Sequence, residues 1–290
     1  MWFYAAISMA FLSGLYVVIS KHTLRAISPI IFFWSVLLIS TPIVFIYAWK
    51  DGFPKLTLLF FVGVLGSVIF YTISKLWFYK IIKDSHLSQV HPLVSLSPII
   101  TLLFAIPILG ERPSGLAVVG SMVSLLGVYV LNISSLREGL FEPFKILFRN
   151  KMAFLMLASV MVGGIVSVFD KLAINNTTPN NSAFALLMED IVIVVGLLPY
   201  MYSKRKIVFT EIFSNKKFII LLGIIGAASN ILGFIALDHA DSGIATAVFR
   251  TQTFFVLFFS FLFFKDRPKL ETVIGATIMI AGLLIIKLAT

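Results

Sequence analysis

The sequence predicts an all-α integral membrane protein, with ten transmembrane helices arranged as two inverted five-helix repeats. Three observations lead to this fold class: a composition too apolar for a soluble surface, apolar runs long enough to cross a bilayer, and an internal repeat. Of the 290 residues, 59% are hydrophobic and 12% are charged, and the mean hydropathy is +1.03. Such a chain is neither an ordinary soluble domain nor a disordered polymer, because both carry far less apolar surface.

Ten apolar segments remain when the sequence is divided at its charged, Pro, Gly and Asn clusters. A helix needs about 20 apolar residues to cross the hydrocarbon core, and continuous runs favour helices over the alternating strands of a membrane barrel. The first segment lacks the basic start and the cleavage site of a signal peptide. The predicted spans are 2–20, 30–49, 57–78, 87–109, 115–133, 152–171, 183–202, 218–237, 243–264 and 270–288.

The internal repeat aligns residues that lie 155 positions apart. Glu111 aligns with Asp266, and the Arg-Pro dipeptide that follows each of them aligns as well. Because each half has an odd number of helices, the second half enters the membrane from the opposite side, as in the inverted repeats of secondary transporters. Chance similarity in a biased composition is the alternative. The predicted domains are a first repeat over 1–133, a basic connecting loop over 134–151 and a second repeat over 152–290.

Glycines and lysines extend the repeat. In each half, two glycines seven residues apart place small side chains on one helix face, which predicts close helix packing within the fold or between the subunits of a homodimer. A second match, at an offset of 150, relates the ends of the first and sixth spans. The aligned pairs are Gly120 with Gly275, Gly127 with Gly282, Gly14 with Gly164, and Lys21 with Lys171.

Several function classes are excluded by what the sequence lacks. It has no Cys, which removes disulfides, thiolate catalysis and thiolate metal sites. The net charge of +10 is divided among the connections and forms no continuous stripe, so no nucleic-acid partner is expected. The nucleotide-binding motif GxxxxGK[ST] and the hydrolase motifs HExxH and GxSxG do not occur. We therefore expect neither an enzyme nor a cofactor.

Four charged residues lie well inside predicted spans, where a charge costs several kcal/mol unless it faces a cavity or a partner. They are Lys75 in 57–78, Glu189 and Asp190 in 183–202, and Arg250 in 243–264. One interpretation is a pair of buried salt bridges that fix helix packing. The other is a central cavity whose basic residues receive a substrate carboxylate and whose acidic residues receive an amine. Adjacent helical residues point about 100° apart, so Glu189 and Asp190 cannot both face one partner, and one of them is the candidate proton-titratable group.

The repeat adds polar candidates for this cavity. Lys75 aligns with Asn230, and both lie in the middle of their spans, so we expect them to approach each other near the pseudo-twofold axis at the bilayer midplane. Arg250 aligns with Ser95, in a span that three prolines interrupt. Tyr71 is a further candidate, as an aromatic side chain that lines the cavity.

Three more residues are candidates for gating or proton relay. Lys21 and Lys171 close the first and sixth spans, where they either extend to the interface or gate the substrate. Asp170 neutralises its neighbour Lys171 in this interpretation. His91 is either a proton relay or a structural histidine.

The chain resembles the drug/metabolite transporter superfamily, specifically its EamA-type members, in its size, its first helix ending in Lys21, and the acidic residue and Gly-rich helix of each half. The residues that carry the resemblance are Gly14 to Lys21, Pro98 to Glu111, Gly120 and Gly127, with the counterparts Gly164 to Lys171, Asp266, Gly275 and Gly282. The resemblance implies membrane transport. It leaves the cargo open, because the family's substrates include amino acids, other metabolites, nucleotide-linked sugars and drugs. The sequence departs from the pattern at Asp266, where Glu is usual, and at Thr253, opposite Pro98.

Charge distribution predicts the orientation in the membrane. Of the 23 Lys and Arg residues, 16 lie in alternate connections that begin with residues 21–29. The positive-inside rule makes these connections cytoplasmic and places both termini outside. The resemblance to ten-helix transporters implies instead that both termini are cytoplasmic.

Together these features predict a secondary transporter in the cytoplasmic membrane that exports small metabolites by alternating access, most consistently amino acids or similar zwitterions. Its expected partners are the lipid bilayer, a small-molecule substrate and, through an acidic residue, protons. Efflux of cationic drugs is the alternative within transport. An intramembrane enzyme or a non-transporting scaffold is the alternative outside it.

Overall fold

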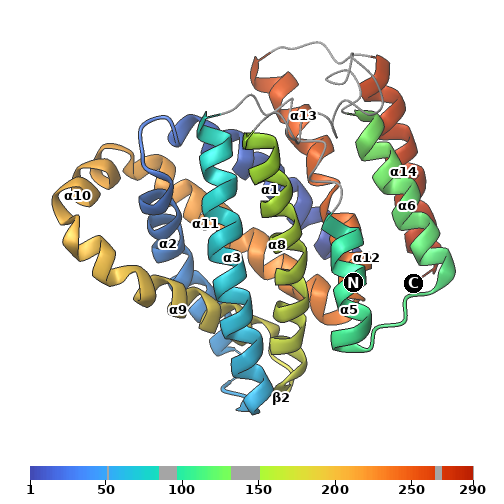
Figure 1. The fold of residues 1–290 in the computed structure, drawn as a ribbon, viewed down its shortest axis with the longest axis horizontal. Coiled ribbons are helices and arrows are strands. Elements are labelled where there is room, and N and C mark those ends of the chain that lie inside the picture. Colours follow the sequence, from blue (N-terminus) through green and yellow to red (C-terminus); the bar gives the residue numbers. More distant parts are fainter. Residues whose placement is uncertain (51, 85–96, 132–150, 265–269, 290) are drawn as a thin grey trace.

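The structure is a computed structural model that describes residues 1–50, 52–84, 97–131, 151–264 and 270–289, and most of these residues are helical (Figure 1). The first part of the chain forms α1 (Trp2–Thr23), α2 (Pro29–Trp49), α3 (Leu58–Asp84), α5 (Ser97–Leu109) and α6 (Gly115–Leu131). The second part forms α8 (Lys151–Asn175), α9 (Ser182–Ser203), α10 (Arg205–Ser214), α11 (Lys216–His239), α12 (Ser242–Phe249), α13 (Gln252–Phe264) and α14 (Leu270–Ala289).

Within the described residues, seven helical segments are long and apolar enough to cross a membrane, and the segment Ser242–Phe259 among them joins α12 to α13. Three further apolar helices, α5, α6 and α14, are shorter. Each predicted span overlaps one of these helices, although the start of the span 87–109 lies outside the described residues. The described residues thus form the all-α membrane fold that the sequence predicts, with seven candidate spans where the sequence predicts ten.

Three local features differ from the predicted spans. The connection 203–217 contains the additional helix α10. The span 243–264 is divided at Arg250 and Thr251 into α12 and α13. Helix α8 continues to Asn175, four residues beyond the predicted end at 171.

Two very short strands join distant parts of the chain at one end of the helices. β1 (Lys55–Leu56) pairs antiparallel with β2 (Thr177–Thr178), with Lys55 opposite Thr178. Asn181 follows β2 and caps α9, because its Oδ1 accepts a hydrogen bond from the Phe184 N–H at 2.9 Å. Its Nδ2 donates to the carbonyl oxygen of Gly52 at 3.1 Å. One asparagine therefore fixes the start of α9 and ties it to the chain before β1.

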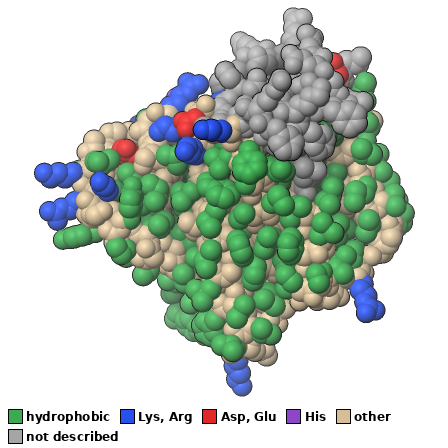
Figure 2. Space-filling view, in the orientation of Figure 1, with side chains coloured by type: hydrophobic (Ala, Val, Ile, Leu, Met, Phe, Trp, Pro, Cys, Tyr) green, Lys and Arg blue, Asp and Glu red, His purple; other side chains and the backbone are tan. Residues whose placement is uncertain are grey.

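The outer surface is strongly apolar, and in Figure 2 hydrophobic side chains cover the middle of the molecule while Lys and Arg lie at its margins. Large side chains such as Leu59, Leu126 and Val195 are more than half exposed. A soluble protein of this kind would aggregate. In lipid the same surface is the solvent-facing one, which agrees with the candidate spans.

Helices pack in pairs, and each pair takes one helix from the first part of the chain and one from the second. α3 lies along α8, α1 along α11, and α6 along α14, and Figure 1 shows the first and last of these pairs side by side. Small residues permit the close approach of α6 and α14: a side chain at Gly127 would collide with the backbone of Met279, and one at Gly282 with the backbone of Ser124. Three of the four glycines predicted to pack closely, Gly120, Gly127 and Gly282, therefore do so within the fold.

This contact gives a test of the packing. Gly127→Ala should lower the free energy of unfolding by roughly 1–3 kcal/mol, the typical cost of overpacking, because neither helix backbone has room for the added methyl group. Gly196→Ala is the matched control, since Gly196 is also helical and nothing lies within 4 Å of the position of its added Cβ. Thermal melts of the purified variants measure the effect. Equal melting temperatures would contradict the assigned contact.

Candidate functional site

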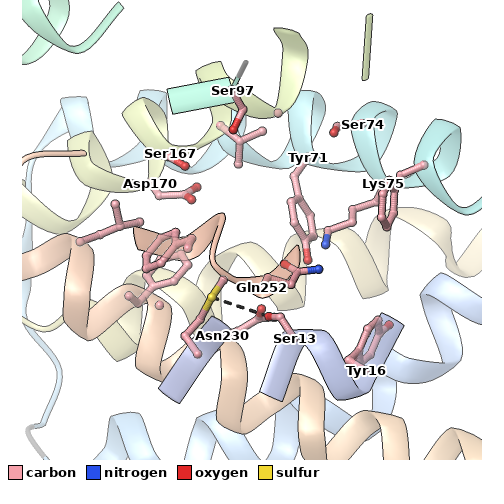
Figure 3. A pocket seen from close by; sticks show the side chains of 18 of the residues that line it. Ser13, Tyr16, Tyr71, Ser74, Lys75, Ser97, Ser167, Asp170, Asn230 and Gln252 are labelled. Atoms are coloured by element: carbon pink, nitrogen blue, oxygen red, sulfur yellow. Dashed lines mark hydrogen bonds between the residues drawn. The ribbon is translucent and has the colours of Figure 1, made fainter. Parts of the chain in front are cut away.

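A cavity of about 230 Å³ lies among the helices and is lined by both basic and acidic side chains (Figure 3). It is bounded by residues of α1, α3, α5, α8, α9, α11, α12 and α13. A smaller cavity of about 50 Å³ shares several lining residues with it. The charged and polar residues that line the larger cavity include Ser13, Tyr16, Tyr71, Ser74, Lys75, Ser97, Ser159, Ser167, Asp170, Glu189, Asp190, Asn230, Arg250, Gln252 and Thr253.

Helix α3 supplies the first basic group. Lys75 follows Tyr71 by four residues, so both side chains lie on one face of the helix. The Lys75 ammonium lies 5.1 Å from the centroid of the Tyr71 ring, which is a cation–π contact. In Figure 3 this pair occupies one side of the cavity, and Asp170 with Ser167 occupies the other.

The second basic group lies where the helical span is interrupted between α12 and α13. Thr251 N–H donates to the carbonyl of Val248 at 3.0 Å, and the Thr251 hydroxyl donates to the same oxygen at 2.8 Å. These i to i−3 bonds end α12, and α13 starts at Gln252. Arg250 is thereby left at the break, facing the cavity, and its buried Nε has no hydrogen-bond partner among the described residues. Breaks of this kind place polar groups at the binding sites of many transporters.

Two acidic groups meet at a hydroxyl of α3. Ser67 is completely buried, and its Oγ lies within hydrogen-bonding distance of Asp170 Oδ1 and 3.0 Å from Glu189 Oε2. The other oxygen of Glu189, Oε1, is buried and has no hydrogen-bond partner among the described residues. Helices α3, α8 and α9 thus bring one hydroxyl and two carboxyl groups together.

Asp190 points elsewhere, as the angle between adjacent helical residues requires. Its Oδ2 accepts a hydrogen bond from the hydroxyl of Ser40 on α2 at 3.3 Å. All three carboxyl groups belong to the cavity lining, yet none lies within 4.0 Å of a nitrogen of Lys75 or Arg250. The described part of the chain therefore contains no ion pair of the kind that the salt-bridge interpretation predicts for these residues.

Most of the predicted cavity residues are brought together by the fold. Lys75 and Asn230, which align in the repeat, line both cavities. Ser95 and His91 lie outside the described residues. The predicted residues that line the larger cavity are Lys75, Asn230, Arg250, Glu189, Asp190 and Tyr71.

The two lysines assigned to gating lie away from this cavity lining. The Lys171 ammonium donates to the carbonyl oxygens of Leu237, of Asp238 at 3.3 Å and of Ala240 at 2.7 Å. It thereby caps the carboxyl end of α11, where a positive charge is favourable. Lys21 lies near the end of α1 and is partly exposed.

Glu111 binds the end of the same turn between α11 and α12, at the first residue of α12. Its two carboxylate oxygens accept hydrogen bonds from the Ser242 N–H at 2.9 and 2.8 Å, and Oε1 also accepts from the Ser242 hydroxyl at 2.7 Å. A carboxylate at this place accepts from the free Ser242 N–H and complements the positive end of α12. The helix that precedes Arg250 is therefore anchored at its start by a residue from the α5–α6 connection.

Sequence reasoning missed Asp170 as a cavity residue, and it missed Ser67 as the hydroxyl that contacts Asp170 and Glu189. Asp170 stands next to Lys171, near the predicted end of its span, so it was assigned to neutralise that lysine. Because α8 continues to Asn175, Asp170 is more than a turn inside the helix and faces α3. A serine in an apolar span gives little signal, although Ser67 stands two helical turns before Lys75, near the same helix face.

Comparisons with known proteins agree with this fold. The model of the EamA-like transporter family matches residues 1–133 and 150–288. One solved structure, described only as "Crystal structure of protein", has a TM-score of 0.69 and 14% sequence identity, covering 98% of this chain and 96% of that chain. At this identity the likeness concerns the fold alone. No curated protein sequence matches the chain.

The anchor at Glu111 gives a second test. Glu111→Ala should lower the free energy of unfolding by roughly 1.5–3 kcal/mol, the usual contribution of hydrogen bonds to a charged group, because it leaves the start of α12 without its cap. Glu211→Ala is the control, because Glu211 accepts one hydrogen bond, from the Ser28 N–H, in a less buried place. Chemical unfolding in detergent compares the two. A larger loss for Glu211→Ala would contradict the anchor.

Proposed function

Because this chain belongs to the EamA-like transporter family, we propose that it is a secondary transporter that exports amino acids or similar zwitterions across the cytoplasmic membrane. Members of this family are membrane transporters of the drug/metabolite type. The observation that carries the proposal is one cavity lined by Lys75 and Arg250 together with three carboxyl groups, without an ion pair between the two sets.

A zwitterion complements this arrangement at both of its ends. Its carboxylate takes the place next to Arg250, whose buried Nε has no acceptor among the described residues. Its ammonium takes the place next to Glu189, whose buried Oε1 has no donor among them. An unpartnered polar group is costly in a medium of low dielectric, so a ligand that supplies both missing partners gains affinity from both.

The size of the cavity supports a small cargo. Sites for drug-sized ligands occupy roughly 300–1,000 Å³, and this cavity is about 230 Å³. Cationic drug efflux also fits less well because two of the five charged lining groups are themselves cations. Both observations favour a small metabolite.

Alternating access follows from the proposal of ten spans in two inverted repeats, 1–133 and 152–290, joined by 134–151. Two observations support it. The family model matches the chain in two parts, 1–133 and 150–288. The helix pairs are also reciprocal: α3 packs on α8, and α11, the helix that aligns with α3, packs on α1. Rocking of one repeat against the other would then expose the cavity to each side in turn.

Counterflow into proteoliposomes tests the transport of zwitterions. Vesicles preloaded with leucine, lysine, glutamate or phenylalanine should accumulate the same labelled amino acid for at least one of the four. The assay needs no imposed ion gradient, so it reports exchange by any coupling mechanism. Absence of counterflow for all four, with correctly folded protein, would contradict the proposed substrate class.

Lys75→Ala gives the matched site control for this assay. It should abolish counterflow and leave membrane insertion unchanged, because it removes a cation from the cavity lining. Lys80→Ala should keep wild-type counterflow, since Lys80 lies on the same helix with its side chain exposed. Equal counterflow by the two variants would exclude Lys75 from the site.

The orientation is proposed from the charges, with the basic connections in the cytoplasm and both termini outside. The chain has no Cys, so single cysteines can be labelled without background. A membrane-impermeant maleimide applied to intact cells should label Thr178→Cys, at β2, and not Lys206→Cys, in α10; both positions are exposed. The reverse pattern would place both termini in the cytoplasm.

A further inference from the structure

The hydroxyl of Ser67 is placed between two carboxyl groups and has only one proton to donate. Its Oγ contacts Asp170 Oδ1 and lies 3.0 Å from Glu189 Oε2. An ionised carboxylate can only accept hydrogen bonds. If Ser67 donates to one of the two carboxyl groups, the other can bond to its oxygen only by carrying a proton itself. Two ionised carboxylates would leave one contact as a repulsion between oxygen atoms.

We infer that Asp170 and Glu189 share one proton through Ser67, and that this proton is displaced by the ammonium group of the cargo. The second half of this statement rests on the proposed function. The first half concerns the protein alone and stands independently of any substrate.

The unpartnered oxygen assigns the proton to Glu189. Glu189 is 6% exposed, and its Oε1 has no hydrogen-bond partner among the described residues. Of the two carboxyl groups that share the proton, Glu189 holds it at the lower cost, because a bare oxygen is costlier on a buried carboxylate than as the uncharged carbonyl oxygen of a neutral carboxyl group. The chain of donors then runs from Glu189 Oε2 to Ser67 Oγ, and from the Ser67 hydroxyl to Asp170 Oδ1. Asp170 is the ionised member.

The groups around the pair balance this charge. α2, α5 and α11 contribute no charged side chain to the cavity lining, and Lys171, beside Asp170, points to the end of α11. With one shared proton the pair carries a single negative charge, and together with Asp190 it balances Lys75 and Arg250. Besides Asp170 and Glu189, the titratable groups that line the two cavities are Tyr16 of α1, Tyr71, Lys75 and Tyr79 of α3, Asp190 of α9, and Arg250 after α12.

Departure of the proton would leave two negative charges at one buried hydroxyl. An ammonium that enters as the proton leaves keeps this end of the cavity at a single negative charge. The proton and the cargo ammonium therefore compete for one place. Glu189 releases the proton from Oε2, and the cargo ammonium donates to the carboxylates in its stead. No bond within the cargo changes.

Infrared spectroscopy of the full chain in detergent at pH 7 tests the shared proton. The wild-type protein should show the carbonyl band of a protonated carboxyl group, with the small downshift in D₂O that identifies it. Asp170→Asn and Glu189→Gln should each lose the band, because the remaining carboxylate then has the Ser67 hydroxyl to itself. Asp190→Asn is the matched control and should keep it, because Asp190 has its own donor in Ser40.

Two outcomes would overturn the shared proton. The first is the absence of the band in the wild-type protein, a result that depends on no variant. The second is a band that persists in Asp170→Asn, because that band would belong to Glu189 alone. The displacement is tested by adding leucine, lysine, glutamate or phenylalanine to the wild-type protein. An amino acid that gives counterflow should abolish the band, and a band unchanged by it would refute the competition. If no amino acid gives counterflow while the band behaves as expected in the variants, the shared proton stands and the proposed substrate class fails.

Discussion

The low dielectric of the hydrocarbon core is the constraint on which the rest of this structure depends. A charged side chain is tolerated there only if it faces water, a hydrogen-bonding group or an opposite charge. Lys75, Asp170, Glu189, Asp190 and Arg250 come from four parts of the chain and all line one cavity. The outer surface is correspondingly apolar. The same energetic penalty therefore keeps charges away from lipid and collects them where a polar cargo can use them.

Small residues make this arrangement geometrically feasible. Ser67 and Ser40 are almost fully buried and supply the hydroxyl groups that contact the carboxyl groups. Their short side chains let α3 and α2 lie close enough to α8 and α9 for direct hydrogen bonds. Glycine does the same for backbone contact, since Gly63 on α3 faces Ala173 on α8. Close helix packing and the polar site thus share one cause, a backbone approach that larger residues would prevent.

Features set by the bilayer could be predicted from the sequence. The thickness of the hydrocarbon core fixes the length of an apolar span, so the helices fell where their hydropathy predicts. The cost of a charge singled out Lys75, Glu189, Asp190 and Arg250, and the repeat assigned Asn230 to the same cavity as Lys75. All five residues line the larger cavity.

The missed features depend on local hydrogen bonds that hydropathy does not register. α10 is short and carries both charged and apolar residues, so no apolar run marks it. The break at Arg250 and Thr251 contains neither Gly nor Pro and is made by the bonds of Thr251 to Val248. Asp170 was assigned to the wrong environment because the end of α8 was placed one turn too early.

The break and the anchor at Glu111 are parts of one arrangement. α12 has eight residues, about 12 Å of helix at 1.5 Å per residue. Its first residue is held by Glu111, and Arg250 follows its last. Lys171 binds the carbonyl oxygens of the preceding turn. Because α12 is this short, its anchored start lies only about two turns from Arg250, and the turn that Glu111 and Lys171 bind is close to the cavity break. Glu111 and Lys171 are therefore part of the site's geometry, although neither lines the cavity.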